Sequence, residues 1–347
     1  MTVGFVTNPN HAGHGVEGHP ESPQRLEAVL ALLDECGLLN RLENIEPRDA
    51  TDEELAWVHP PEFTATLRRT CADGGGWADP DTYLLPGSYA AALTAAGSTI
   101  AATDAVLSGQ IDSAFCAVRP PGHHARPGQA MGFCLLNNVA LAARAAQRRH
   151  GLERVAIVDI DVHHGNGTQD AFYDDPGVLY CSTHQFPFYP GSGHPSETGA
   201  SAGARASETT NVNIALPGGC GDEQYRAAFE QVIEPVVRRF QPQLILVSCG
   251  FDAHFADPLA GMALTTAGYG ELTQRLVALA GELCDGRLVA VLEGGYDLVA
   301  LPWGVRTVIE TLLGESPTPD PLGTLTPERA PDIAALLEDV RRLHGLG

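Results

Sequence analysis

Short apolar runs rich in β-branched residues recur along the chain, and longer segments with a helical spacing of apolar positions separate them. Several runs are apolar at nearly every position, which is typical of parallel strands covered on both faces. Strands that alternate with helices predict an α/β fold with one parallel sheet between two helical layers. The predicted strands are Val3–Thr7, Ser113–Val118, Val155–Asp161, Val178–His184, Asn211–Leu216, Leu244–Cys249 and Leu288–Glu293. The predicted helices are Ser22–Leu39, Tyr89–Leu107, Asn138–His150, Asp222–Phe240, Thr266–Cys284 and Val299–Leu313.

The 347 residues read as one large unit up to about residue 314, with no repeat or low-complexity tract. The stretch 315–331 is rich in Pro and Thr and predicts a surface connection, which a short helix follows at Ile333–Leu343. We therefore predict one domain over residues 1–314. Residues 315–347 form a connection and a short helix that pack on the same domain.

The charge balance excludes one class of function. The chain has 43 acidic and 21 basic residues and a net charge of −22. A nucleic-acid binder needs a positive surface to replace phosphate counterions, so we expect no direct nucleic-acid binding. No apolar run approaches the ~20 residues of a membrane span, and Met1–Asn10 lacks the pattern of a signal peptide. We expect a cytoplasmic protein that does not contact membranes.

The eight cysteines form no CxxC pair, and most stand inside apolar runs. We therefore expect buried, reduced thiols, and neither disulfides nor a cysteine-based zinc site. The 13 histidines are more informative, because several stand beside Asp and Gly where predicted strands end.

Polar clusters flanked by glycine follow four of the predicted strands. They are Arg119 to Ala125, Asp159 to Gly167, Ser248 to Asp252 and Leu292 to Tyr296. In open α/β sheets the ligand crevice lies outside the carboxyl ends of the strands. The four clusters are therefore expected to meet at one site.

Asp161 and His163 stand two residues apart at the end of a predicted strand, so their side chains share one face. With Asp252 from another strand end they offer two carboxylates and one imidazole. Three ligands with N and O donors are typical of a catalytic zinc site that keeps one position open. The alternative is that Asp161 and His163 only form hydrogen bonds within a loop; the neighbouring clusters favour the metal.

His123 and His124 are adjacent, so only a loop can direct both rings into one cavity. Two imidazoles beside a metal-bound water suit general base and general acid catalysis near neutral pH. Asp159 is placed to orient one ring, and Asn166 to hold the other. The alternative, in which both histidines bind zinc, is less favoured because three protein ligands are already present.

Tyr296 follows the Gly294-Gly295 pair after a predicted strand. Its phenol could donate a hydrogen bond to an oxyanion and so stabilise a tetrahedral intermediate. The alternative is a tyrosine buried in the core. The two glycines favour a position that faces the site.

These motifs together resemble the zinc-dependent histone deacetylase family, and most closely its class II-like and bacterial members, over residues 3 to 310. The motifs are Gly18 to Leu26, Arg119 to Ala125, Gly132 to Asn138, Asp159 to Gln169, Gly250 to Leu259 and Glu293 to Asp297. The resemblance implies the arginase/deacetylase fold with an eight-stranded parallel sheet, and a catalytic domain over residues 1–314. It also implies hydrolysis of an N-acetyl amide to acetate and an amine.

The resemblance assigns roles to the same residues. Asp161, His163 and Asp252 become the ligands of one Zn²⁺. His124 becomes the general base and later the acid, with His123 as its electrostatic partner and Tyr296 as the carbonyl-polarising phenol. Asn166 stands where class I relatives have Asp, as in class II-like members.

The resemblance also implies a substrate tunnel and structural cations. Gly132 and Phe133 match the tunnel wall, and Tyr189 stands where the family often has a facing Phe. The family carries structural K⁺ or Na⁺ ions. The positions that match the first cation site are Asp159, Asp161, His163, Ser182 and Thr183, and those that match the second are Phe172, Asp175 and Val178.

Two positions bear on the substrate. Gly165 replaces the Asp that a two-metal arginase needs, which argues against that activity. Leu259 replaces the rim Glu of polyamine-selective class II relatives and favours acyl-lysine in proteins or peptides. An acetylpolyamine amidohydrolase remains the alternative, because a strongly acidic protein attracts polycations. A third, less favoured alternative is an inactive scaffold that binds acyl groups. The oligomeric state is not predicted.

The early segment Asn8–Gly18 contains His11, His14 and Glu17 and could reach the rim of the site. These side chains could bind an additional metal ion. A solvated loop without metal is the favoured interpretation.

Overall fold

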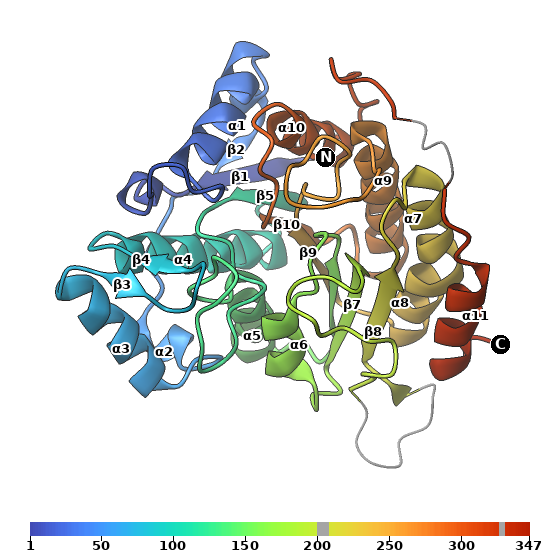
Figure 1. Ribbon diagram of the computed structural model, residues 1–347, viewed down its shortest axis with the longest axis horizontal. Helices are drawn as coiled ribbons and strands as arrows, with labels where there is room; N and C mark the ends of the chain where they lie inside the picture. Colours follow the sequence, from blue (N-terminus) through green and yellow to red (C-terminus); the bar gives the residue numbers. More distant parts are fainter. Residues whose placement is uncertain (200–207, 326–329) are drawn as a thin grey trace.

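The computed structural model describes residues 1–199, 208–325 and 330–347 (Figure 1). These residues contain an eight-stranded sheet in the order β2-β1-β5-β10-β9-β6-β7-β8, in which every neighbouring pair is parallel. The strands are β1 (Val3–Thr7), β2 (Glu43–Asn44), β5 (Ser113–Ala117), β6 (Val155–Asp159), β7 (Val178–Gln185), β8 (Asn211–Leu216), β9 (Leu244–Cys249) and β10 (Leu288–Leu292). The predicted fold class is therefore confirmed.

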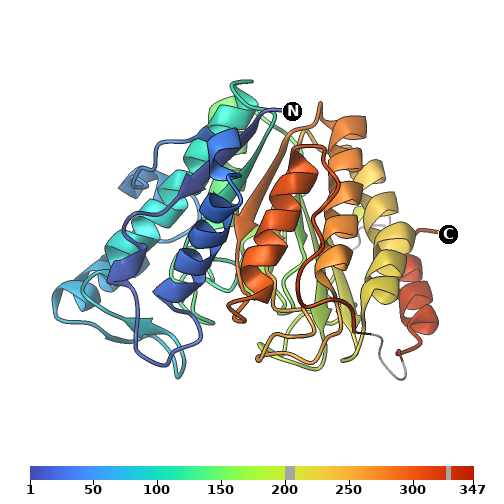
Figure 2. The same ribbon diagram turned by 90° about the horizontal axis from the view of Figure 1, so that it is seen from above.

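Helices cover both faces of this sheet (Figure 2). In β6, Ala156 and Val158 join a core cluster on one face, whereas Val155 and Ile157 join a second cluster on the other. Because both faces are covered, successive strand residues are all buried, and this explains the continuous apolar runs. The first cluster includes α1 (Pro23–Glu35), α7 (Asp222–Ala228), α8 (Glu234–Phe240), α9 (Thr266–Leu283) and α10 (Ala300–Leu312); the second includes α4 (Ser88–Leu107) and α5 (Asn138–His150).

The sequence pattern predicts no segment with the length and apolar character of a membrane span, but helix α4 has both. By length and composition alone, this 20-residue helix is apolar enough to cross a membrane. However, 67% of its most apolar window is buried inside the protein, and core helices of soluble proteins pass the same test. Its apolar character is accounted for by packing against β1, β5 and α5.

Some elements of the structure were not predicted from the sequence pattern. The edge strand β2 has only two residues, both exposed, and α3 (Pro61–Ala72) was not predicted. The predicted helix Asp222–Phe240 contains a π-helical turn at Phe229–Ile233 between α7 and α8. Strand β6 ends at Asp159 and not at Asp161, because the side chain of Asp159 accepts the Asp161 N–H and turns the chain out of the sheet.

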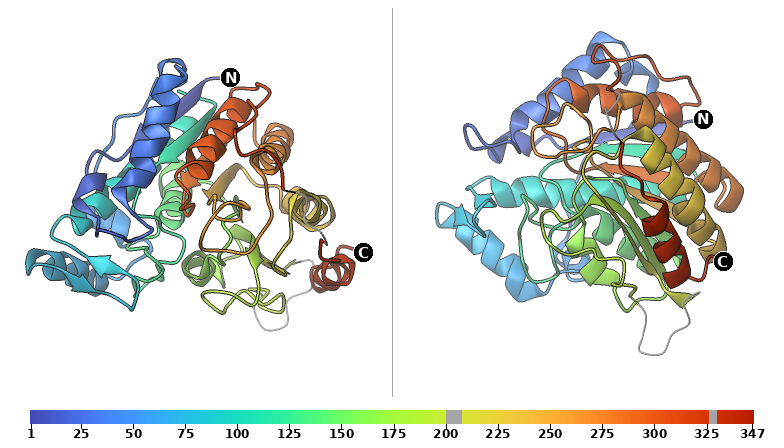
Figure 3. Two further views of the ribbon diagram at one scale, coloured as in Figure 1. Left: turned by 45° about the horizontal axis from the view of Figure 1, so that its top comes forward. Right: turned by 45° about the vertical axis from the view of Figure 1, so that its right-hand side comes forward.

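The C-terminal helix α11 (Ala334–Leu343) packs beside β8 (Figure 3). Its Leu337 and Val340 are buried and join the larger core cluster. Residues 326–329 of the predicted connection lie outside the described residues.

All eight cysteines are free, as expected, and seven are buried. Burial raises the pKa of the Cys116 and Cys220 thiols, so these groups stay protonated. Cys36 is the exception, because it is exposed.

Candidate active site

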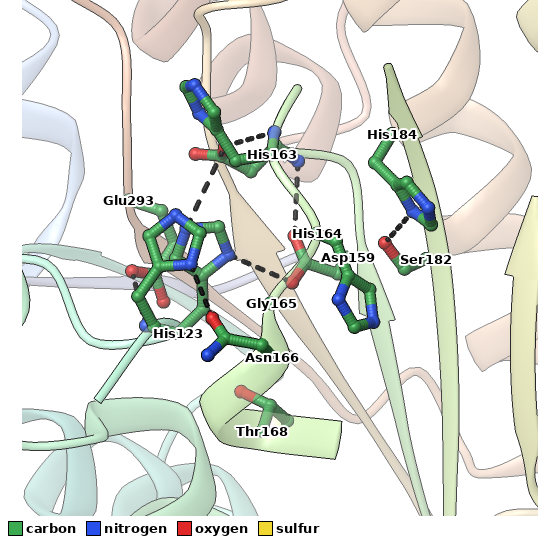
Figure 4. A network of polar contacts seen from close by, with 12 residues as sticks. His123, Asp159, His163, His164, Gly165, Asn166, Thr168, Ser182, His184 and Glu293 are labelled. Atoms are coloured by element: carbon green, nitrogen blue, oxygen red, sulfur yellow. Dashed lines mark hydrogen bonds and ion pairs between the residues drawn. The ribbon is translucent and has the colours of Figure 1, made fainter. Parts of the chain in front are cut away.

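The reactive side chains gather at the carboxyl edge of β5, β10, β9 and β6, which are neighbours in that order. These strands are followed, respectively, by His123 and His124, by Tyr296, by Asp252, and by Asp161 and His163. Because the carboxyl ends of parallel neighbours meet at one edge, the order of the strands explains why the four clusters converge. Figure 4 shows part of this edge, with His123, His163, Asp159 and Glu293 labelled.

Asp161, His163 and Asp252 meet at one point. Each offers a ligand atom within 4.8 Å of the others, and all three residues are buried. The Nδ1 atom of His163 lies 3.1 Å from Oδ1 of Asp161 and 3.2 Å from Oδ2 of Asp252. The predicted ligand set is therefore brought together by the fold.

Backbone groups fix the two carboxylates. The N–H of Gly294 donates to Oδ2 of Asp161 over 2.8 Å, and the N–H of Val162 donates to Oδ1 of Asp252 over 2.9 Å. A Cβ atom at Gly294 would lie 2.0 Å from Oδ2 of Asp252, so only glycine fits there. Gly294 therefore allows the carboxylates to lie close to the backbone after β10, and the backbone N–H groups hold each carboxylate in one orientation.

The cluster attracts positive charge. Burial opposes the charged imidazole, but hydrogen bonds to both carboxylates raise the pKa of His163 to about 10. Burial also opposes a charged Asp161, yet His123 and His163 hold its pKa well below the ordinary value. Burial and the charge of Asp161 raise the pKa of Asp252. Two carboxylates that face one imidazole form a centre suited to a cation.

The two adjacent histidines have different partners. Nδ1 of His123 lies 3.1 Å from Oδ2 of Asp159, and Nδ1 of His124 lies 2.8 Å from Oδ1 of Asn166. Burial lowers the pKa of His124, and the charges of His123 and His163 lower it further. Burial has the same effect on His123, but Asp161 and Asp159 outweigh it and raise its pKa well above the ordinary value. At neutral pH the pair thus combines a neutral ring with a cationic ring.

Tyr296 is held from two sides. Its backbone N–H donates to Oδ2 of Asp257 over 2.6 Å, and the Arg25 guanidinium lies 4.9 Å from the centre of its ring. Burial raises the pKa of its phenol well above the ordinary value, so the group remains a hydrogen-bond donor. Arg25 also donates to the carbonyl oxygens of Gly295 and Glu293, which fixes the loop after β10.

Aromatic rings surround the site. Phe133 meets Tyr296 edge-on at 5.8 Å, and Tyr189 meets His124 edge-on at 5.1 Å between ring centres. Gly132 has a φ of 57°, and a Cβ atom there would lie 2.4 Å from Cδ2 of His124. Leu259 is half-buried, and its N–H donates to Asp257. The predicted wall residues at 132, 133 and 189 therefore lie against the reactive rings.

The residues predicted to bind monovalent cations lie in two places. Ser182 is buried beside Asp159, where its hydroxyl contacts Nδ1 of His184 at 2.8 Å, and the Thr183 hydroxyl donates to the Asp159 carbonyl. Phe172 ends α6 (Asn166–Phe172), Val178 begins β7, and Asp175 lies in the turn between them. The Arg144 guanidinium pairs with Asp175 and lies 4.4 Å from the Phe172 ring centre. Cation binding at either place stays a prediction.

The early histidines do not join a metal-binding group. His14 is buried, contrary to the expectation of a solvated loop, and its Nδ1 lies 2.6 Å from the Ser88 hydroxyl. Burial lowers the pKa of His14 to about 4. Within the described residues, two groups have metal-binding geometry, and neither includes His11, His14 or Glu17.

A model of the histone deacetylase domain matches residues 19–312. The chain belongs to the histone deacetylase family. The probable deacetylase of Archaeoglobus fulgidus is 42% identical over 357 residues, which cover 99% of this chain and 98% of that protein. The histone deacetylase-like amidohydrolase of Pseudomonas aeruginosa is 41% identical over 333 residues, covering 95% and 85%. The crystal structure of the HDA15 HD domain superposes with a TM-score of 0.89 at 37% identity, covering 99% and 94%. This histone deacetylase relative is therefore a hydrolase with the arginase/deacetylase fold.

Within this member of the histone deacetylase family, the motifs left some site residues without a role. Phe188 stacks on His163 with 5.5 Å between ring centres, so the wall has a second aromatic ring beside Tyr189. The Tyr180 hydroxyl donates to Asp159 over 3.0 Å. Glu293 is the first residue of the motif Glu293 to Asp297 and is fully buried beside His123. The position of Tyr180 near Asp159 could have been predicted only from strand spacing, because Tyr180 stands two residues before Ser182 in β7 and alternate strand residues share a face.

Proposed function

We propose that this chain is a zinc-dependent amidohydrolase that removes acetyl or other short acyl groups from the side-chain amine of acyl-lysine. The observation that carries the proposal is the cluster of Asp161, His163 and Asp252 beside two imidazoles with different partners, Asp159 for His123 and Asn166 for His124. Metal-assisted hydrolysis combines a metal-activated water with a separate base, and the residues at this edge of the sheet support both roles.

Asp161, His163 and Asp252 fit one Zn²⁺ ion. Catalytic zinc sites use three protein ligands with N, O or S donors and keep a position for water or substrate, whereas structural sites use four. Backbone N–H groups hold both carboxylates in one orientation, which favours a defined coordination geometry. When bound, zinc would polarise the amide carbonyl and acidify a water molecule.

The remaining groups support proton transfer. The neutral ring of His124 accepts a proton from water and returns it to the departing amine. The cationic ring of His123, held by Asp159, stabilises the negative charge that develops nearby. The protonated phenol of Tyr296 donates a hydrogen bond to the same developing oxyanion.

Two features bear on the substrate. Phe133 and Tyr189 present aromatic surfaces beside the reactive rings, which suits the methylene chain of a lysine side chain. Leu259 adds no charge to recognise the second amine of a polyamine. The net charge of −22 favours a second candidate, an acetylpolyamine amidohydrolase, because it raises the local concentration of polycations.

The test is a substrate panel on chelated and zinc-reloaded protein. We expect acetyl-lysine peptides to be hydrolysed only after one equivalent of Zn²⁺ is restored, with kcat/KM above that for acetylputrescine and acetylspermidine. Asp252→Asn should lower both zinc content and turnover. Hydrolysis that survives chelation would refute the metal, and a preference for the polyamines would select the second candidate.

A further inference from the structure

The carboxylate of Glu293 is buried beside His123 (Figure 4). It immediately follows β10, and the mechanism above gives its side chain no role. Its Oε2 atom accepts the Gly122 N–H over 2.6 Å and the His123 N–H over 3.1 Å. One carboxylate oxygen therefore binds two successive backbone amides of the turn that carries both imidazoles.

Other groups hold this turn from the opposite side. The side chain of Asn138 donates to the Pro120 carbonyl over 3.1 Å, and the Thr168 N–H donates to the His123 carbonyl over 3.1 Å. A Cβ atom at Gly122 would lie 2.5 Å from the backbone nitrogen of Asn138, so the turn is pressed closely against α5. The carbonyls of the turn are thus anchored by α5 and α6, and its amides by Glu293.

The hydrogen bonds that the Glu293 side chain accepts come from the backbone of the turn that carries His123 and His124. Its second oxygen, Oε1, is buried and has no hydrogen-bond partner among the described residues. Burial of a carboxylate is costly, and hydrogen bonds from two amides recover part of that cost. Burial raises the pKa of Glu293 to about 7, whereas the charge of His123 opposes the increase. Since only Oε2 binds the turn, a glutamine could supply the same acceptor.

Resting on the proposed function, we propose that Glu293 is a positioning residue for deacylation. It fixes the backbone of Gly122 and His123, so that both rings keep their partners and face the bound amide. Without this anchor the turn loses its amide contacts, and both rings drift from the reactive geometry. A displacement of about 1 Å costs on the order of 10²-fold in rate when reacting groups must be aligned.

The test compares Glu293→Ala and Glu293→Gln in the zinc-loaded protein. We expect Glu293→Ala to lower kcat by about 10- to 100-fold with KM changed less than about threefold, because substrate contacts remain. Glu293→Gln keeps an acceptor for the two amides and should retain kcat within about threefold of the wild type. Both variants should bind one zinc per chain.

Glu54→Ala is the matched control, because Glu54 is another buried carboxylate whose partners, Arg48, Arg149 and the Thr51 N–H, lie outside the site. We expect Glu54→Ala to lower the thermal midpoint but leave kcat unchanged. Equal kcat values in Glu293→Ala and Glu54→Ala would overturn the proposal. So would an equal loss of kcat in Glu293→Ala and Glu293→Gln, because the charge and not the acceptor would then matter.

A crystal structure of Glu293→Ala gives a readout that does not depend on turnover. We expect longer distances from His123 to Asp159 and from His124 to Asn166 than the 3.1 and 2.8 Å of the native chain. Unchanged rings would overturn the positioning role. If the wild type hydrolyses no acyl amide, the proposed function fails, and this comparison still decides whether Glu293 holds the rings.

Discussion

Asn166 contacts His124 with an amide oxygen at 2.8 Å, whereas Asp159 contacts His123 with a carboxylate oxygen at 3.1 Å. An amide oxygen orients an imidazole without adding charge, but a carboxylate stabilises the imidazolium. Burial lowers the pKa of both imidazoles. The charges of Asp161 and Asp159 outweigh this effect at His123 and raise its pKa, whereas the charges of His123 and His163 lower the pKa of His124 further. This difference separates the base from its cationic partner.

Replacing Asn166 with Asp should remove that difference. A carboxylate at hydrogen-bond distance raises the pKa of an imidazole by about 1–3 pH units. The neutral form of His124 then exists only at higher pH, so the acidic limb of the kcat/KM profile should move upward in Asn166→Asp. Profiles of kcat/KM between pH 5 and 10 for both proteins, at fixed zinc, check this. An unmoved acidic limb would show that His124 is not the base.

Tyr296→Phe should lower kcat by about 10²- to 10³-fold, the loss typical of one oxyanion donor. The ring contacts with Phe133 and Arg25 remain, so folding and zinc content should match the wild type. Steady-state kinetics and metal analysis of the same preparation measure both. Full activity in Tyr296→Phe would remove the phenol from the mechanism.

Gly294→Ala should disrupt the metal centre, because the added Cβ would lie 2.0 Å from Oδ2 of Asp252 and 2.7 Å from Oδ2 of Asp161. We expect zinc affinity to fall at least tenfold, as measured by competition with a chelating dye. Gly281→Ala is the control: it is exposed in α9 with no atom within 4 Å of the added Cβ. It should stabilise the helix by up to about 1 kcal/mol and leave zinc affinity unchanged.

Glu21 should stabilise the fold in a pH-dependent way. Burial alone would raise its pKa, but Arg119 and Arg25 lower it from 4.5 to about 2. Because the pKa is lower in the folded chain, the stabilisation is present above about pH 4.5 and is lost as the pH falls toward 2. Glu21→Gln leaves the fully buried Arg119 without its counter-charge and should cost about 3–5 kcal/mol at pH 7.

Urea unfolding at pH 7 and pH 3 measures this effect. The difference between wild type and Glu21→Gln should shrink at the lower pH. Glu315→Gln is the control, because its ion pair with Arg41 is exposed and should contribute less than about 1 kcal/mol. A difference of the same size at both pH values would contradict the assignment to Glu21.

Much of the sheet could be predicted, because strands such as β6 and β9 are buried along their whole length and are apolar at nearly every position. The polar residues just beyond those strands could be predicted to converge, since parallel neighbours end at one edge. The exposed two-residue strand β2 carries no apolar signal. Its existence depends on pairing with β1, which a pattern within Glu43–Asn44 does not contain.

The supporting contacts of the site could not be predicted for a related reason. The contact between Glu293 and the Gly122 N–H joins residues that are far apart in the sequence. Neither residue type nor spacing indicates which buried carboxylate meets which amide. Phe188 likewise joins the wall only because its loop folds back onto His163.

The order of the central strands has a consequence for synthesis of the protein. His123 and His124 emerge early from the ribosome, but Tyr296 follows β10, which inserts between β5 and β9. In a nascent chain that stops before β10, the two halves of the sheet, β2-β1-β5 and β9-β6-β7-β8, are not yet joined. The phenol of Tyr296 has also not been synthesised. We therefore expect activity to appear only after β10 has paired with both β5 and β9.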